Sequence, residues 1–217
     1  MSDEIRPLPS LTLQLPALLR LGGVVVAFEK WSSTEDHFPR SFLGEDDKER
    51  LSRLRSPLSQ AEFVAGRAAL HRAGRALGYD VRAVRIATDR RSGKPHFDAL
   101  QPCFNFSITH TRGLACCVAS RNCAVGCDCE RWDRTIDKEE LSYFFGTKFL
   151  TNRECLIAWT KLEALIKLSG ENLADKVDRS GQLRSSAIVK RQEGHMSVSA
   201  FDINSEFVFS FCVENRS

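Results

Sequence analysis

Two long amphipathic helices, one in each half of the 217-residue chain, organise the expected fold. The first begins at the N-cap Ser56, with Pro57 in the first helical position, and its apolar residues recur at helical spacing until Gly78. A capping box opens the second helix at Thr151, and Gly170 ends it. Each half of the chain is therefore expected to contain one long helix.

Short strand-like segments lie around both helices. Val24, Val25 and Val26 follow a glycine turn, and a β-branched cluster after such a turn is typical of a buried strand. The residues before this turn are interpreted as an N-terminal extension. The expected strands cover residues 24–28, 84–87, 104–108, 114–119, 124–130, 187–190, 196–201 and 207–214. Each half thus offers strands around one long helix.

Positive charge is concentrated in one segment of the chain. Residues 50–94 hold eleven Lys or Arg against three Asp or Glu, although the whole chain has a formal charge of only +3. A basic segment beside an acidic remainder suits an anionic ligand, because the local field attracts phosphates. On the first helix Arg67 lies at the edge of the apolar stripe, where it can reach a ligand, and Arg72 points away. A solvated, arginine-rich helix face is the alternative.

The eight cysteines do not indicate a disulfide framework. The chain begins with acidic residues and has no signal peptide, so we expect reduced thiols and a cytoplasmic location. The cysteines lack the two C-x₂₋₄-C pairs of a structural zinc site, and thiols packed in buried strands explain them better. The apolar stretch 11–28 is interrupted by polar residues, so we expect no membrane span. Walker, Rossmann and nucleophile-elbow motifs are missing.

The segment 125–130 reads Val-Gly-Cys-Asp-Cys-Glu, and its alternation carries a chemical signal. Successive side chains of a strand face opposite ways, so Asp128 and Glu130 share one face and the two cysteines share the other. Neighbouring carboxylates repel each other unless a cation neutralises them, and oxygen-only ligands suit Mg²⁺ better than zinc. The alternative is an edge strand with a solvated acidic face.

The second helix adds a third carboxylate. Trp159, Glu163 and Lys167 lie at i, i+4 and i+8 on one face of this helix. A separate, largely apolar stripe is expected to hold Cys155, Ala158, Leu162, Leu165, Ile166 and Ser169. Glu163 could therefore join the two strand carboxylates, and Lys167 could contact a phosphate. An ordinary Glu–Lys surface pair is the alternative for these two residues.

Five segments occur in order along the chain: Gly66-Arg67, Gly93-Lys94-Pro95, Phe106-Ser107-Ile108-Thr109-His110-Thr111, Val125-Gly126-Cys127-Asp128-Cys129-Glu130 and Trp159-Thr160-Lys161-Leu162-Glu163-Ala164-Leu165-Ile166-Lys167. The last three resemble the ordered signatures of the 4'-phosphopantetheinyl transferases, and the first two resemble N-terminal features of the longer, surfactin-synthetase type. The resemblance spans roughly residues 45–170.

This resemblance implies an α+β fold of two pseudo-symmetric halves, each a small antiparallel sheet packed with a long helix. Residues 1–121 would form the half on the nucleotide side of coenzyme A, and residues 122–217 the half on the metal side. Active-site residues would gather at the seam between the halves, where ligand clefts are common. The longer type of this family is generally monomeric, so we expect a monomer.

The implied reaction transfers the phosphopantetheine arm of coenzyme A to a serine of an apo acyl or peptidyl carrier protein and releases adenosine 3',5'-bisphosphate. By similarity, Asp128, Glu130 and Glu163 would hold Mg²⁺ together with diphosphate oxygens. Lys167 would contact the phosphate that the serine attacks. A base must also take the serine proton, and either Glu163 or a metal-bound water could do so.

The nucleotide end of coenzyme A would be bound by His110, Arg67 and Lys94, again by similarity. The motif on the second helix departs from the family pattern, because Leu162 stands where the family usually has a lysine. We expect this change to affect the rate or the choice of substrate. A non-catalytic relative that binds coenzyme A is an alternative function. Nucleic-acid binding by the basic segment is a third reading, but the segment lacks the interleaved aromatic residues of a stacking surface.

Overall fold

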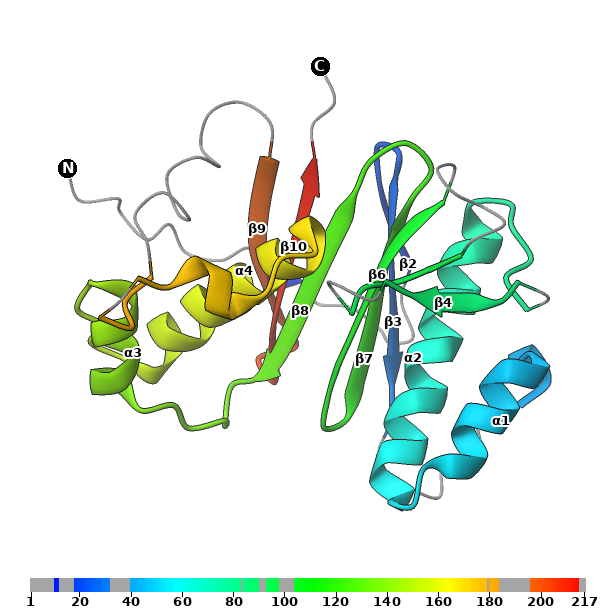
Figure 1. The fold of residues 1–217 in the computed structure, drawn as a ribbon, viewed down its shortest axis with the longest axis horizontal. Helices are drawn as coiled ribbons and strands as arrows, with labels where there is room; N and C mark the ends of the chain where they lie inside the picture. The colour runs from blue at the N-terminus through cyan, green and yellow to red at the C-terminus, as the bar shows by residue number, and fades with distance from the viewer. Residues whose placement is uncertain are drawn as a thin grey trace.

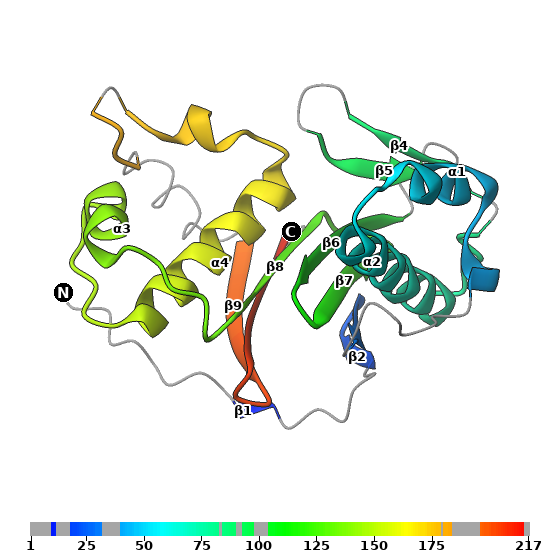
Figure 2. The same cartoon turned by 90° about the horizontal axis from the view of Figure 1, so that it is seen from below.

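The computed structural model describes residues 10–11, 18–31, 40–82, 84–89, 93–97, 104–178, 180–183 and 196–214. Two four-stranded sheets lie face to face, and a long helix covers the outer face of each (Figure 1). A small third sheet, formed by β4 (Ile86–Thr88) and β5 (Pro95–Phe97), extends from the second of these sheets (Figure 2). The described part of the chain is therefore an α+β fold.

Besides packing face to face, the two large sheets adjoin each other at one edge strand of each. The first has the order β1 (Ser10–Leu11), β9 (Met196–Ile203), β10 (Phe207–Glu214), β8 (Val125–Arg131). The second has the order β2 (Leu18–Leu21), β3 (Val24–Lys30), β7 (Leu114–Ser120), β6 (Asn105–Thr111). Neighbouring strands are antiparallel, except that β1 is parallel to β9. The edge strands β6 and β8 lie side by side at the seam between the sheets.

Four α-helices occur in the described residues: α1 (Glu45–Arg53), α2 (Pro57–Ala76), α3 (Lys138–Phe145) and α4 (Asn152–Ser169). Short 3₁₀ helices, η1 (Arg40–Phe42) and η3 (Leu173–Lys176), precede α1 and follow α4. Helix α2 packs on β3 and β7, and α4 packs on β8 and β10. None of the helices described is both long and apolar enough to cross a membrane.

The caps of the two long helices confirm their predicted positions. The Ser59 amide donates to the Ser56 hydroxyl at 3.4 Å at the start of α2. At the start of α4, Thr151 and Glu154 form both hydrogen bonds of a capping box. Gly170 closes α4 in the left-handed conformation, with φ of 66°, which glycine adopts without steric cost.

Alternating side chains of β3 build two different cores. Val24, Val26 and Phe28 face the first sheet, where they pack with apolar residues of β8 and β10. Val25 and Ala27 face α2. This two-sided burial explains why the strand reads as a continuous apolar run and not as an alternating pattern.

The predicted N-terminal extension was wrong in part. β2 pairs with β3, and β1 joins the first sheet beside β9, so these early residues belong to the sheets. The predicted strand 187–190 lies outside the described residues. The seven cysteines within the described residues are free thiols, and six of them are buried, as the prediction of packed thiols requires.

Helix α4 buries a different set of residues from the one predicted. Cys155 and Leu162 are buried as expected, whereas Ser169 is exposed. The rest of the predicted stripe is half-buried: Ala158, Leu165 and Ile166. The other fully buried residues are Leu156, Thr160, Ala164 and Leu168. Ala164 and Leu168 pack against Cys212 of β10, which fixes the face that α4 turns to the sheet.

A half-buried ion pair links the second sheet to α2. The Arg72 guanidinium donates to the Glu29 carboxylate at 2.7 Å, and Glu29 is 6% exposed. Burial raises the pKa of Glu29, and Arg72 only partly offsets this effect. The folded state therefore holds this proton more tightly than the unfolded chain does.

Glu29→Gln is expected to remove one part of the pH dependence of stability. A raised pKa stabilises the fold fully below the unfolded value, and this contribution is lost as the pH rises through the folded value. Urea unfolding of both proteins upward from about pH 4 measures the difference. Glu154→Gln is a control of opposite sign, because the backbone amides of Thr151 and Leu150 lower the pKa of Glu154. Parallel stability curves for Glu29→Gln and the unaltered protein would contradict the prediction.

Candidate functional site

Side-chain hydrogen bonds join β6 to β8 at the seam. The Cys127 amide donates to the Ser107 hydroxyl at 3.1 Å, and the Cys127 thiol donates to the Ser107 carbonyl at 3.3 Å. Two residues further along each strand, the Cys129 amide donates to the Thr109 hydroxyl at 3.3 Å. The backbone amides of β8 thus donate to side-chain hydroxyls of β6, where a regular sheet would use backbone carbonyls as acceptors. These hydrogen bonds fix the register of the two strands.

Asp128 is the buried acid of this seam. The Thr109 hydroxyl donates to Asp128 Oδ1 at 2.9 Å, and the Lys167 ammonium donates to the same oxygen at 2.7 Å. Asp128 is only 6% exposed, and its second oxygen, Oδ2, is buried without a hydrogen-bond partner in the described structure. A buried polar atom without a partner is costly, so Oδ2 marks a place where a cation or donor would be stabilised.

Helix α4 brings Lys167 to Asp128 because the backbone of β8 has no side chain at Gly126. A Cβ atom there would overlap the Ala164 carbonyl oxygen and lie 2.5 Å from the Leu168 nitrogen. Gly126 and Asp128 are two residues apart, so both face the helix. The predicted common face of the strand carboxylates is consistent with this arrangement, because Cys127 on the opposite face lies in the core between the sheets.

The charges of the site act on one another. Although burial alone would lower the pKa of Lys167, the Asp128 carboxylate raises it above its usual value. Burial raises the pKa of Glu163, and the Asp128 charge raises it further, whereas Lys167 and Arg134 lower it. Burial also raises the pKa of Glu130, against the lowering effect of Arg134. The three predicted carboxylates and Lys167 therefore lie within one electrostatic neighbourhood.

Arg134 is a further member of the site that the sequence did not indicate. Its guanidinium forms an ion pair with Glu130, and its charge also lowers the pKa of Glu163. Arg134 lies in the loop between β8 and α3 and lines a cavity of about 450 Å³ with Trp159 of α4. No spacing rule links a loop arginine to a strand carboxylate, so only the folded chain reveals the contact.

The donor chemistry fits a divalent cation, although the side chains are paired differently. In the described residues, no group of three or more His, Cys, Asp or Glu is arranged to hold a metal ion. Lys167 pairs with Asp128, and Arg134 pairs with Glu130. The unpartnered Asp128 Oδ2 and the mutual repulsion with Glu163 both favour an added cation. An oxygen-only donor set suits Mg²⁺, and ligation by all three carboxylates would require Glu130 to leave Arg134.

The three predicted nucleotide-binding residues lie apart from one another. Arg67 of α2 forms an ion pair with Asp47 at 2.7 Å and lines a cavity of about 730 Å³ between α1 and β4. His110, at the end of β6, is half-exposed and lies 3.8 Å from Glu62 of α2. The structure joins neither residue by a direct contact to the carboxylates of the site.

Lys94 contacts β8 and α4, the elements that carry the carboxylates of the site, more closely than the other two residues do. Its ammonium donates to the Leu168 carbonyl at 3.0 Å and to the Val125 carbonyl at 3.3 Å. Burial lowers the pKa of Lys94. This residue ties the loop before β5 to the end of α4 and the start of β8, so it holds the seam together.

Two further motif residues, Leu162 of α4 and Thr109 of β6, have clear places. Leu162 is 5% exposed and belongs to the core, as its position in the predicted apolar stripe suggested. Thr109 was noted only as part of a motif, yet its hydroxyl contacts Asp128, the Cys129 amide and, at 3.4 Å, Lys167. Its place opposite the Asp-x-Glu strand is a long-range pairing that the sequence alone did not predict.

Comparison with protein-family models finds no match to this chain, and comparison with curated proteins finds none either. The resemblance to a known family therefore depends on the sequence motifs alone.

Proposed function

We propose that this protein is a Mg²⁺-dependent 4'-phosphopantetheinyl transferase that modifies apo acyl or peptidyl carrier proteins. One observation carries the proposal: Asp128 and Lys167, from two motifs 39 residues apart, are bonded at 2.7 Å, with Thr109 of the third motif on the same carboxylate oxygen. A coincidental set of sequence matches would not be expected to converge on one buried acid.

The proposed metal site consists of Asp128, Glu130 and Glu163. Bound Mg²⁺ would neutralise charge on the diphosphate of coenzyme A as its phosphorus–oxygen bond breaks. Thr109 orients the Asp128 carboxylate by donating to Oδ1, so that Oδ2 remains available. Because Arg134 is half-exposed beside Glu130, it can exchange its carboxylate partner for a phosphate oxygen.

In the proposed reaction the serine oxygen of the carrier attacks the phosphorus of the phosphopantetheine arm. The bond to the bridging diphosphate oxygen breaks, adenosine 3',5'-bisphosphate leaves, and a base takes the serine proton. Lys167 stabilises the added negative charge on the attacked phosphate. Glu163 is suited to accept the proton because burial and the Asp128 charge raise its pKa. Mg²⁺, when bound, would supply an activated water as the alternative acceptor.

The nucleotide end is proposed to contact Arg67, Lys94 and His110, on the half of the chain formed by residues 1–121. The half formed by residues 122–217 would supply the metal ligands. We also propose that the two halves are pseudo-symmetric, since each large sheet carries one long helix on its outer face. The monomeric state and the cytoplasmic location remain predictions.

Incubation of the full chain with coenzyme A, Mg²⁺ and a panel of apo carrier proteins tests the proposal. We expect at least one carrier to gain the mass of a phosphopantetheine group, as measured by mass spectrometry of the intact carrier. The gain should disappear when EDTA removes Mg²⁺, and it should be lost with a carrier whose acceptor serine is replaced by alanine. Absence of transfer to every carrier of a broad panel would contradict the proposal.

A non-catalytic protein that binds coenzyme A is the second candidate. Leu162 favours it, because a leucine buried in the core cannot supply the cation that the family usually has next to the helix glutamate. Binding of coenzyme A without transfer to any carrier would support this candidate. The Arg134 ion pair argues against it, since this cation already pairs with Glu130 and its charge lowers the pKa of Glu163.

A further inference from the structure

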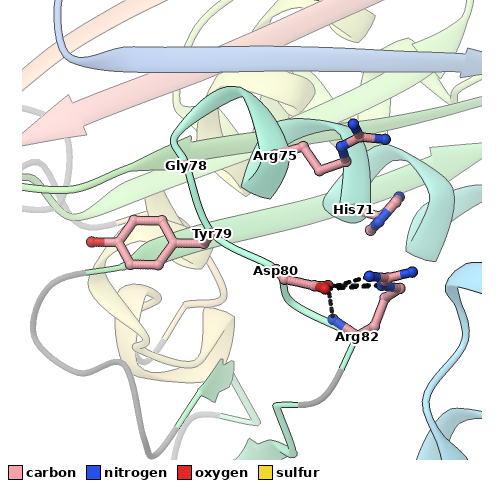
Figure 3. A pocket seen from close by; sticks show the side chains of 6 residues that line it. All are labelled: His71, Arg75, Gly78, Tyr79, Asp80 and Arg82. Carbon is pink, nitrogen blue, oxygen red and sulfur yellow. Dashed lines mark hydrogen bonds and ion pairs between the residues drawn. The ribbon is translucent and has the colours of Figure 1, made fainter.

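A third cavity, at the C-terminal end of α2, gathers cationic side chains that the proposed reaction does not use. It has a volume of about 410 Å³ and is lined by His71, Arg75, Gly78, Tyr79, Asp80 and Arg82. This volume lies within the range of ordinary small-molecule sites. Figure 3 shows the His71 ring between the guanidinium groups of Arg75 and Arg82, with the Tyr79 ring directed away from them.

Asp80, the acidic residue that lines this cavity, forms an ion pair with Arg82. Asp80 accepts from Arg82 Nε at 2.8 Å, from Arg82 Nη2 and from the Arg82 amide at 3.1 Å. These two charges therefore cancel. Arg75 forms no ion pair with any other described residue, so its positive charge remains uncompensated beside the cavity.

The positive charges that line the cavity affect the pKa of His71. Its ring stacks on Phe42 of η1, with centroids 5.7 Å apart. Burial lowers the pKa of His71, and the charges of Arg82 and Arg75 lower it further, against the opposing effect of Asp80. Burial and the two arginines thus disfavour the protonated imidazole, and a bound anion would favour it.

We propose that this cavity binds the dianionic phosphate group of a phosphate monoester. Arg75 and a protonated His71 would supply two positive charges, which match a dianion, and Arg82 is held ready in a fixed orientation by Asp80. The cavity is larger than a phosphate group needs, so it leaves room for the organic part of the ligand.

This site is distinct from the proposed transfer site. Arg75 and His71 do not line the larger cavity that contains Arg67, and the two cavities share only Asp80 and Arg82. A variant of Arg75 therefore probes the phosphate cavity without altering the residues proposed for coenzyme A. The outcome is independent of whether the chain transfers phosphopantetheine.

Titration of the full chain with inorganic phosphate, followed by NMR of the histidine side chains, tests the proposal. Potassium chloride keeps the ionic strength constant, and His71→Gln assigns the His71 signals. We expect a saturable shift of these signals and a higher His71 pKa in phosphate, because a dianion favours the protonated ring. Acetate, a monoanion, is expected to bind at least about tenfold more weakly.

The matched pair of variants is Arg75→Gln and Arg20→Gln, which change the net charge equally. Arg20 lies on the edge strand β2 and does not line the cavity. Arg75→Gln is expected to weaken phosphate binding at least about tenfold, and Arg20→Gln to leave it unchanged. An unchanged His71 pKa in phosphate would overturn the proposal. Equal weakening by both variants, or equal binding of acetate, would overturn it as well.

Discussion

Glu163→Gln is expected to abolish Mg²⁺-dependent transfer and, at the same time, to make the protein without metal more resistant to heat. The two effects have one cause. Burial and the Asp128 charge both disfavour the ionised Glu163 carboxylate, which shows as its raised pKa. A neutral glutamine of similar shape removes this repulsion, but it also removes a charged ligand and a candidate base.

The loss of transfer should be at least about a hundredfold, as for other groups that stabilise charge in a transition state. Mass spectrometry of the carrier measures the activity, and thermal unfolding in EDTA measures the stability. Thermal unfolding with added Mg²⁺ gives an independent readout, because an ion that binds only the folded state raises the midpoint. The unaltered protein should gain stability from Mg²⁺, and the variant should gain less.

Glu139→Gln is the matched control, since Glu139 is an exposed carboxylate on α3. It should retain transfer and respond to Mg²⁺ like the unaltered protein. A Glu163→Gln protein that keeps its activity would exclude this carboxylate from the mechanism. A variant that is inactive but less stable without metal would indicate a structural role for Glu163 and contradict the electrostatic argument.

The sequence predicted the elements whose signals are local. The caps of α2 and α4 are short motifs that act within one turn, so both helices were placed correctly. The strand β3 was predicted from its β-branched run, which both neighbouring layers bury. By contrast, β2 is a four-residue edge strand that exists through its pairing with β3, and α1 buries only Leu51.

The candidate site was predicted in its composition but not in its pairing. Alternation along a strand suffices to put Asp128 and Glu130 on one face, and helical spacing puts Glu163 and Lys167 on another. Neither pattern says which cation pairs with which carboxylate. In the structure Lys167 forms an ion pair with Asp128, and Arg134 forms one with Glu130. The Lys167–Asp128 contact exists only after α4 has packed on β8, whereas Arg134 reaches Glu130 from a position only four residues further along the chain.

Gly126→Ala is expected to destabilise the fold by about 3 kcal/mol, the upper part of the range for overpacked cores. The new methyl group would meet the Ala164 carbonyl oxygen and the Leu168 nitrogen, which are backbone atoms of α4 and cannot turn aside as a side chain could. The helix would have to move away from β8. This movement would open the small core formed by Ala164, Leu168 and Cys212.

Urea unfolding of Gly126→Ala measures this loss, and Gly23→Ala is the matched control. Gly23 has no atom within 4 Å of an added Cβ and no left-handed backbone, so its replacement should change stability by less than about 0.5 kcal/mol. Equal stability of the two variants would mean that α4 does not need this close approach. Movement of α4 would also withdraw Lys167 from Asp128, so Gly126→Ala should lose transfer as Glu163→Gln does. The two variants should nevertheless shift the free energy of unfolding in opposite directions. Gly126→Ala disturbs the packing that holds the site in place, whereas Glu163→Gln removes a charge that opposes folding.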